Sequence, residues 1–364
     1  MSSNETAAPA ILVLNAGSSS LKFAVYSWSA ASDKLPRLFH GAIDGLGSRP
    51  RFRLFADKDA LLEDRPLAAH GHQQAMACLL DWLDRPERRI TLVAAGHRVV
   101  HGGEHFSRPL RLDAQHLARL RDYTPLAPLH MPHNLAAIEA LWQQRPTLPQ
   151  VACFDTAFHH SMPLVEQLIA LPRPYRERGI RRYGFHGLSY EYIASVLPDY
   201  LGDVAEGRVI VAHLGHGASL CALHKRKSRA TTMSFTPLDG LPMATRPGAI
   251  DPGVLLYLLR HEGLSVAALE ELLNHQSGLL ALSESSADMR QLLADQRPQA
   301  QQAIDYFVHH CRRAIGSLTA VLGGLDALVF TAGIGEHAPT VRAAICDTLG
   351  WLGIELDDEK NRAN

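Results

Sequence analysis

The stretch LNAGSSSLKFAVY, residues 14–26, decides the fold. An apolar run precedes a bend of one glycine and three serines, and an alternating apolar run follows it. This pattern predicts two strands joined by a tight polar turn. Glycine and small hydroxyl residues let backbone N–H groups converge on an anion, and Lys22 adds positive charge. The bend is therefore either a phosphate-binding turn or a plain hairpin turn, which favours the same composition.

A second stretch, RVIVAHLGHGASLCAL (208–223), repeats this arrangement. Both stretches contain, in the same order, an apolar strand, a glycine-bearing bend, a Ser-Leu pair and another apolar strand. When the two Ser-Leu pairs are aligned, Ser219 corresponds to Ser20. A duplicated domain with one glycine-rich hairpin in each half explains the similarity, although any two hairpins look alike. Two related bends in one chain strengthen the phosphate-binding interpretation.

Length and composition indicate two α/β domains. The chain has 364 residues, a length that exceeds what one hydrophobic core usually holds. Hydrophobic residues make up 46% of it, which is enough for two cores. We place the boundary in the proline-bearing segment 141–150, which gives domains 1–150 and 151–364. Strands are predicted at 11–14, 21–26, 90–95, 151–154, 208–214, 219–224 and 327–332. Helices are predicted at 72–83, 113–122, 132–142, 252–262, 265–274, 286–295, 299–322 and 339–349.

Charge and targeting features exclude several functional classes. With 36 basic and 37 acidic residues the net charge is −1, which predicts neither a nucleic-acid partner nor an anionic membrane. The five scattered cysteines predict buried free thiols rather than a disulfide framework or zinc site. The first ten residues predict a short disordered lead-in rather than a signal peptide, and no apolar stretch predicts a membrane span. We therefore expect a cytoplasmic protein.

Four charged side chains follow predicted strands or lie in glycine-rich loops. Arg98 lies in AGHRVVHGG (95–103), Arg246 in PMATRPGAIDPG (242–253) and His186 in RYGFHGLS (182–189). Each of these residues is either a solvated loop residue or part of a set whose positive charge holds a carboxylate or stabilises a transferring phosphoryl group. Asp155, at the exit of a buried strand, could orient a metal-bound water or act as a turn residue. The neighbouring pair His159-His160 is interpreted as a surface feature.

Known nucleotide motifs are absent or weak. No GxxxxGK[ST] sequence occurs, so no P-loop is predicted. Gly333, Gly335 and Ala338 match a dinucleotide-binding pattern, but Pro339 predicts that the helix begins beyond Ala338, too late for such a site. A Rossmann dehydrogenase is therefore the least favoured alternative.

Taken together, the motifs resemble the acetate kinases, within the acetate and propionate kinase family. The matching stretches are LNAGSSSLKF, GHRVVHGG, PLAPLHMPHN, FDTAFH, RRYGFHGLSY, HLGHGASLCA, FTPLDGL with TRPGAIDPG, SGLLALSESSADMR and FTAGIGEH. They occur in family order over nearly the whole chain. The resemblance implies the actin/hexokinase/Hsp70-like fold, with two related α/β domains around a nucleotide cleft. It implies reversible phosphoryl transfer between ATP and a short-chain carboxylate, giving an acyl phosphate and ADP.

The resemblance also assigns roles to residues. Arg98, Asp155, His186 and Arg246 are implied as catalytic residues, of which Arg98 also binds the substrate carboxylate. Val100, Leu129 and Pro237 are implied as the acyl-methyl pocket, and Asn15 as a residue at the Mg²⁺ site, with Mn²⁺ as an alternative metal. The implied nucleotide-binding residues are Lys22, Ser18, Ser20, His213, Leu214, Gly215, His216, Gly217, Asp288, Met289, Arg290, Gly333, Ile334, Gly335, Glu336 and His337. The family is usually dimeric, so a homodimer is expected.

Some positions depart from the family pattern. His216 and His337 stand where asparagine is usual, Ala244 replaces an expected glycine, and Ala249 stands where a polar residue is common. The resemblance stops at GIELDDEKNRAN (353–364), whereas family members continue through a strand, a metal-site glutamate and a helix. We therefore expect weaker metal-dependent catalysis and a less stable core.

Three functions follow, in order of preference. Acetate kinase is the leading interpretation, and propionate kinase is the alternative within the family. The third is a catalytically weakened nucleotide-binding form, which the shortened C-terminal region favours and the retained charged residues oppose.

Overall fold

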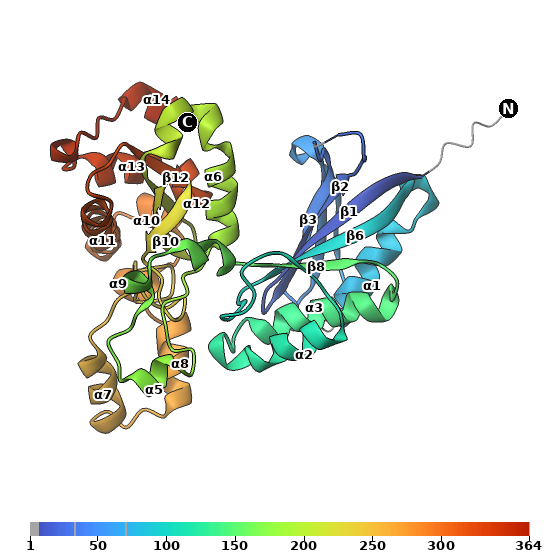
Figure 1. Ribbon diagram of the computed structural model, residues 1–364, viewed down its shortest axis with the longest axis horizontal. Helices are drawn as coiled ribbons and strands as arrows, with labels where there is room; N and C mark the ends of the chain where they lie inside the picture. The colour runs from blue at the N-terminus through green and yellow to red at the C-terminus, as the bar shows by residue number, and fades with distance from the viewer. Residues whose placement is uncertain (1–6, 33, 70, 364) are drawn as a thin grey trace. The chain divides into compact units, whose positions relative to one another are not determined.

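The computed structural model describes residues 7–32, 34–69 and 71–363 (Figure 1). The chain divides between Ala157 and Phe158 into two compact units, called unit 1 and unit 2 below. The division follows strand β8 (Gln150–Phe154) instead of preceding it, because β8 pairs with β6 of unit 1. Residues 1–6 of the expected N-terminal lead-in lie outside the described residues, and strand β1 already begins at Ala8.

Unit 1 is built on an eight-stranded sheet with the order β5-β4-β3-β2-β1-β6-β8-β7. Its strands are β1 (Ala8–Ala16), β2 (Ser20–Ser27), β3 (Arg37–Asp44), β4 (Arg51–Ala56), β5 (Leu61–Pro66), β6 (Ile90–Val99), β7 (Leu110–Arg111) and β8. Its helices are α1 (His72–Leu83), α2 (Ala114–Asp122) and α3 (Met131–Gln144). Strands β1, β6 and β8 run parallel, and β1 to β5 form an antiparallel meander. The carboxyl ends of β6 and β8 therefore meet at one edge of this sheet.

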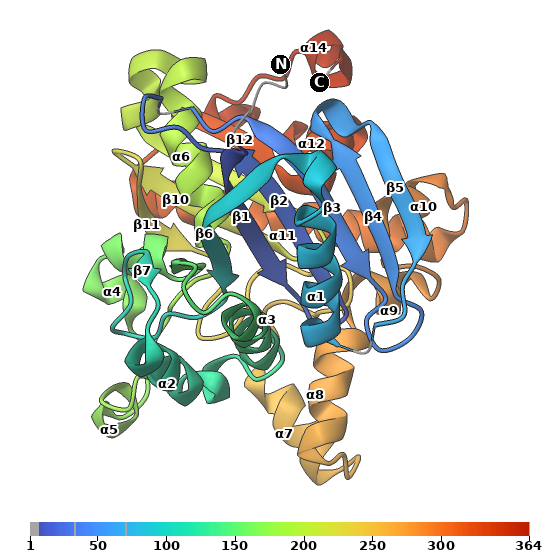
Figure 2. The same cartoon turned by 90° about the vertical axis from the view of Figure 1, so that its right-hand side faces the viewer.

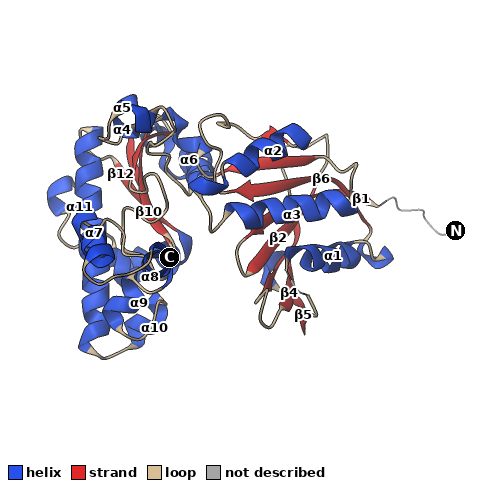
Figure 3. Cartoon of the chain, turned by 90° about the horizontal axis from the view of Figure 1, so that it is seen from below, coloured by secondary structure: helices blue, strands red, loops and turns tan. Residues whose placement is uncertain are grey.

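The core of unit 1 lies between this sheet and helices α1 and α3 (Figure 3). Alternate residues of β1, among them Leu12 and Leu14, are buried, as expected for a sheet with one covered face. Met76 and Trp82 of α1 are fully buried in the same cluster. This packing fixes the β1–β2 hairpin against the helices.

Unit 2 contains a four-stranded sheet with the order β11-β10-β9-β12. Its strands are β9 (Arg208–Leu214), β10 (Ala218–His224), β11 (Lys227–Thr231) and β12 (Ala327–Thr331). Its helices are α4 (Leu164–Gln167), α5 (Arg173–Arg176), α6 (Gly187–Leu201), α7 (Pro252–Arg260), α8 (Val266–His275), α9 (Gly278–Ser283), α10 (Met289–Ala294), α11 (Pro298–Leu322), α12 (Ala332–His337), α13 (Pro339–Cys346) and α14 (Asp358–Ala363). Helices α6 and α11 both pack on this sheet, and Figure 2 shows α6 along it. Most residues of β9 and β10 are buried.

Four neighbouring strands of the unit 1 sheet, β3-β2-β1-β6, share the topology of the unit 2 sheet, which agrees with the duplication that the sequence predicts. Each has an antiparallel hairpin, β1–β2 or β9–β10, with a parallel strand beside its first member. The equivalence of Ser20 and Ser219 is wrong, however. In each hairpin we compare the second cross-strand pair from the turn, which is Asn15–Lys22 in the first hairpin and His213–Ser219 in the second. The structural equivalent of Ser219 is therefore Lys22.

The structure contains elements that the sequence patterns did not predict. Strands β3, β4, β5, β7 and β11 and helices α4, α5, α6, α9, α12 and α14 are additional to the predicted elements. The prediction that the helix following strand β12 begins only beyond Ala338 is wrong, because the short helix α12 begins at Ala332 directly after β12. The starts at Asp251-Pro252 and at Pro339 are confirmed.

The cysteines agree in most respects with the predicted buried free thiols. All five cysteines are free thiols. Cys221, Cys311 and Cys346 are buried, whereas Cys78 and Cys153 are only half-buried. Burial raises the pKa of Cys221 to about 12 and also raises that of Cys311. Among the described residues, no helix is both long enough and apolar enough to cross a membrane.

Candidate functional site

In unit 1 the structure brings together Asn15, Arg98 and Asp155, three of the predicted site residues. Arg98 is the penultimate residue of strand β6, and Asp155 directly follows the parallel neighbour β8. The Nε atom of Arg98 donates to both Asp155 oxygens at 3.0 and 3.1 Å, and Nη2 donates to Oδ2 at 2.5 Å. Nη1 donates to Oδ1 of Asn15 at 3.0 Å. The carboxylate raises the pKa of Arg98, so the guanidinium stays charged.

A buried amide connects this cluster to the first hairpin. Asn134, near the start of α3, is 2% exposed. Its Nδ2 donates to the carbonyl of Ala16 at 2.8 Å, and its Oδ1 accepts the N–H of Val100 at 2.9 Å. The end of β1 and the end of β6 are therefore joined by one side chain, which sequence reasoning missed although Asn134 lies in the quoted stretch PLAPLHMPHN.

The first hairpin turn carries the predicted phosphate-binding residues. The N–H of Gly17 donates to the carbonyl of Ser20 at 2.8 Å and closes the turn. Ser18 and Lys22 are exposed, and Ser20 is half-buried. Nε2 of His72 lies 2.8 Å from the Gly17 carbonyl, which accepts its proton and ties the turn to helix α1.

In unit 2, His186 lies at the centre of a second cluster. It precedes helix α6 and has φ +58°, a left-handed conformation that non-glycine residues seldom adopt. Its Nδ1 lies 2.8 Å from Oγ of Ser219, and its ring stacks on His213 with centroids 4.2 Å apart. Oγ of Ser189 lies 2.9 Å from Nδ1 of His213. Two imidazoles are therefore held in fixed orientations.

Arg246 approaches the same place from a loop. A methyl group on Gly217 would lie 3.2 Å from Nε2 of His186 and 3.9 Å from Nη1 of Arg246. Nη1 of Arg246 also donates to the carbonyl of Pro237 at 3.2 Å. The structure thus brings His186 and Arg246 together at the Cβ position of a glycine in the second hairpin turn. A Cβ at this glycine would narrow the space between them.

A cavity of about 560 Å³ borders this turn. It is lined by Gly215, His216, Ser286, Ala287, Asp288, Met289, Arg290, Gln291, Gly333, Ile334, His337 and Ala338. Segments from three predicted nucleotide-binding motifs therefore meet in one cavity of the size that ligand pockets have. Four lining residues that the sequence motifs did not single out lie next to predicted ones in the chain: Ser286, Ala287, Gln291 and Ala338. A cavity of about 570 Å³ elsewhere in unit 2 contains none of the predicted site residues.

Some predicted nucleotide-binding residues do not line this cavity. Leu214 is fully buried in the core, and His213 and Gly217 belong to the His186 cluster. Gly335 is buried, and Oε1 of Glu336 accepts the N–H of Ala332, which caps helix α12. The predicted loop at 333–337 is this short helix, whose first turn faces the cavity.

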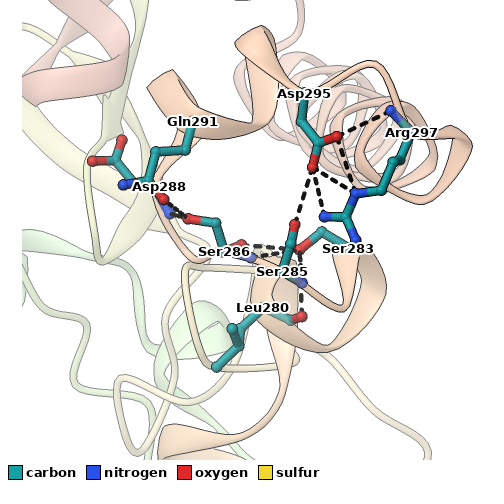
Figure 4. A network of polar contacts seen from close by, with 8 residues as sticks. All are labelled: Leu280, Ser283, Ser285, Ser286, Asp288, Gln291, Asp295 and Arg297. Carbon is teal, nitrogen blue, oxygen red and sulfur yellow. Dashed lines mark hydrogen bonds and ion pairs between the residues drawn. The ribbon is translucent and has the colours of Figure 1, made fainter.

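Serine side chains form hydrogen bonds within the segment of the cavity wall that contains Asp288 (Figure 4). The buried Ser283 accepts the N–H groups of Ser285 and Ser286 at 3.3 and 3.2 Å. Ser286 accepts the N–H of Asp288 at 3.0 Å and donates to Gln291 at 2.6 Å. Asp288 then caps helix α10 by accepting the N–H of Arg290. The hydrogen bonds from the Arg290 side chain, and then from its N–H, lower the pKa of the Asp288 carboxyl. These hydrogen bonds therefore fix the backbone of the turn that precedes helix α10.

The residues predicted to bind the acyl methyl group differ in exposure. Val100 is buried, Leu129 is 41% exposed, and Pro237 is half-buried. A pocket that these three side chains share stays a prediction. By contrast, the interpretation of His159 as a surface residue is wrong. Its ring is buried, and both ring nitrogens have hydrogen-bond partners inside unit 2. Nδ1 pairs with Oγ of Ser228 at 2.9 Å, and Nε2 pairs with the carbonyl of Phe185 at 2.9 Å.

The donors in unit 1 fit a magnesium ion better than a softer metal. Among the described residues, no group of three His, Cys, Asp or Glu side chains is placed to hold a metal. Mg²⁺ usually binds one or two oxygen-bearing side chains and completes its shell with waters and phosphate oxygens. Asn15 and Asp155 offer such oxygens, each with lone pairs beyond those that Arg98 engages.

Comparisons with known proteins agree with these features. The chain matches the acetokinase family over residues 10–364. It is 52% identical to the acetate kinase of Rhodopseudomonas palustris (strain ATCC BAA-98 / CGA009), a match that covers 96% of this chain and 89% of that protein. It is similar to the crystal structure of Porphyromonas gingivalis acetate kinase, with 35% identity, a TM-score of 0.87 and coverage of 97% and 90% of the two chains. For a propionate kinase from Francisella tularensis subsp. tularensis SCHU S4 the identity is 37% and the TM-score 0.90, over 98% and 91% of the chains.

The fold is the actin/hexokinase-like one, as the sequence resemblance implies. The four-strand topology that the two sheets share and these matches over most of both chains agree with it. The chain belongs to the acetokinase family.

Proposed function

We propose that this chain transfers a phosphoryl group reversibly between ATP and acetate, giving acetyl phosphate and ADP, by direct in-line transfer. One observation carries the proposal. The second hairpin turn borders the nucleotide-sized cavity with Gly215 and His216, and its next residue, Gly217, faces His186 and Arg246. A nucleotide in the cavity would direct its phosphates along this turn toward two groups that can stabilise negative charge.

Arg98 is the group in unit 1 that would bind the carboxylate of acetate. Its guanidinium is held by Asp155 and Asn15, so its plane is fixed before substrate arrives. A carboxylate is already ionised near neutral pH, so no base is needed to remove a proton. Asp155 would therefore orient Arg98 and the metal instead of acting as a general base.

Asn15 and Asp155 are the residues that would hold Mg²⁺, with Mn²⁺ as an alternative. When bound, the ion neutralises charge on the phosphate oxygens and orients them. Lys22, Ser18 and Ser20 would bind phosphate from the first hairpin turn. The exposure of Ser18 and Lys22 supports this role.

We also propose that the chain is a homodimer in the cytoplasm. Helix α7, all of which the structure describes, has no buried residue, and Val254, Leu256 and Tyr257 are 42 to 54% exposed. An apolar helix face of this kind fits a second copy of the chain. Free cysteines favour a reducing compartment. Light scattering should report a dimer, and Tyr257→Glu should shift it to monomer while Tyr192→Glu, on another exposed position, should not.

Trapping acyl phosphate with hydroxylamine tests the reaction. The chain with ATP, Mg²⁺ and acetate should form acetyl hydroxamate, and Arg246→Ala should lower kcat by about 100-fold or more. Wild-type turnover in Arg246→Ala would contradict the role of this residue, and lack of product from the wild type would contradict the function.

Propionate is the alternative substrate, because one of the similar structures is a propionate kinase. One methylene group changes discrimination by only ~1–3 kcal/mol. The ratio of kcat/KM for acetate and propionate decides between them, and a higher value for propionate would reverse the assignment.

A further inference from the structure

A chain of three hydrogen-bonding side chains ends at His186. Tyr190 lies one turn into α6, and its hydroxyl pairs with Oγ of Ser219 on β10. The same oxygen lies 2.8 Å from Nδ1 of His186. Tyr190 and Ser219 are both fully buried, so their hydroxyl groups need hydrogen-bond partners within the protein. They find these partners in each other and in the imidazole of His186.

The direction of the protons in this chain follows from what each group can donate. Burial raises the pKa of Tyr190 well above its usual value, so the phenol keeps its proton. Among the described residues, Ser219 Oγ is the hydrogen-bond partner of that phenol, so Tyr190 donates to it. The single hydroxyl proton of Ser219 is then directed to His186, whose Nδ1 must accept. Neutral His186 therefore carries its proton on Nε2.

The Nε2 edge of this imidazole faces the second hairpin turn. A methyl group on Gly217 would lie 3.2 Å from Nε2, and the ring cannot turn freely because it stacks on His213. A proton on Nε2 points toward the side of the turn that Arg246 also approaches. That is the side where negative charge would develop on a transferring phosphoryl group.

We propose that Ser219 and Tyr190 are positioning residues, which orient His186 and set its tautomer so that Nε2–H donates to the transferring phosphoryl group. The role of His186 rests on the proposed function, whereas the tautomer follows from the hydrogen-bond chain alone. Neither hydroxyl touches the reactants. Their effect passes through the imidazole.

The tautomer can be measured without any turnover. In the full-length wild type labelled with ¹⁵N-histidine, long-range ¹H–¹⁵N spectra assigned with His186→Gln should show His186 protonated at Nε2. Ser219→Ala should give a mixture of the two tautomers and lower kcat about 10-fold or more, with the KM values little changed. Ser219→Thr, which keeps a hydroxyl, should restore the Nε2–H form and part of kcat.

Matched controls separate this role from general destabilisation. Ser228→Ala removes the hydroxyl from a different Ser–His pair of unit 2, the buried pair of Ser228 with His159, and should leave the His186 tautomer unchanged. Tyr190→Phe should shift the tautomer ratio and lower kcat, whereas Tyr192→Phe, 66% exposed on the same helix, should change neither.

Each outcome decides a separate question. Protonation of wild-type His186 at Nδ1, or an unchanged tautomer and kcat in Ser219→Ala, would overturn the proposal. Wild-type kcat in His186→Gln would overturn the proposed role of His186 in transfer but not the tautomer assignment, which the spectra test independently.

Discussion

Arg98 binds Asp155 through two guanidinium nitrogens, Nε and Nη2, and this fork holds the guanidinium plane at the carboxyl edge of the unit 1 sheet. The Asp155 side chain is only 3% exposed, whereas that of Arg98 is 33% exposed. The buried partner therefore anchors the cation, and the cation still reaches the surface where an anion can bind. Planar forked geometry of this kind is specific to arginine.

Arg98→Lys should lower kcat/KM for acetate by about 10- to 100-fold, because a single ammonium cannot hold Asp155, Asn15 and a substrate carboxylate together. The KM for ATP should change little, since the cavity residues lie in unit 2. Steady-state kinetics with each substrate varied measures both values. Arg111→Lys, on an exposed strand position, is the control. An unchanged kcat/KM for acetate in Arg98→Lys would contradict the carboxylate-binding role.

Gly278→Ala should disturb the Arg246 loop and lower kcat strongly. Gly278 has φ +65°, and an added Cβ would lie 2.1 Å from the carbonyl oxygen of Met243 and 2.8 Å from the N atom of Arg246. The backbone of the loop must therefore shift. Gly263→Ala is a close control, because Gly263 has φ +68° but open space around its Cβ position. The control should lose stability through backbone strain yet keep kcat, and equal kcat losses in both variants would argue against this mechanism.

Gly333→Val should raise the KM for ATP at least about 10-fold, because its side chain would project into the nucleotide cavity. The position has open space at Cβ, so the fold should tolerate the change. Gly350→Val, at another glycine with open space but outside the cavity, should leave the KM for ATP unchanged. Nucleotide titration by calorimetry gives the affinity directly, and full affinity in Gly333→Val would place the adenosine elsewhere.

Acid should destabilise unit 1 through its buried histidines. Burial lowers the pKa of His97 to about 4 from 6.5, and its Nε2 pairs with Gln150 at 2.7 Å. Below pH 6.5 the unfolded chain takes up the proton before the folded chain does, so stability present above pH 6.5 is lost as pH falls toward 4. This loss amounts to about 3 kcal/mol, at about 1.36 kcal/mol per pKa unit. Burial lowers the pKa of His101 to about 3, which adds in the same direction.

Urea unfolding of His97→Gln at pH 7 and pH 4.5 measures this effect. The difference in unfolding free energy between the two pH values should shrink by a few kcal/mol relative to the wild type. The exposed His105→Gln should show the wild-type difference. Because only the pH dependence is compared, a uniform loss of stability in His97→Gln does not affect the result. An unchanged difference would show that His97 is not the residue that couples folding to pH.

Local patterns predicted the hairpins and much of the candidate site. The bends at 17–19 and 215–217 are visible because glycine and serine interrupt apolar runs, and the strands on both sides pair as expected. Strand β4 was missed although Arg51, Phe52, Arg53 and Leu54 alternate between exposed and buried positions. That alternation was available in the sequence.

Contacts between distant segments could not be read from local patterns. His159 is buried by Ser228, 69 residues away, and His186 is oriented by Ser219, 33 residues away. The clash that makes Gly278 necessary involves Met243 and Arg246. Such pairings depend on the tertiary fold, so glycine and histidine residues with very different roles look alike in the sequence.

All the residues that line the nucleotide cavity come from unit 2, and Arg98 comes from unit 1. His216 and His337 reach this cavity from different segments. If the cavity holds the nucleotide as proposed, preference among nucleotide bases can be altered there without changing the strand that carries Arg98. Under the proposed function, protein engineering then has one set of positions for redesigning the phosphoryl donor and a separate set for redesigning the acid that accepts it.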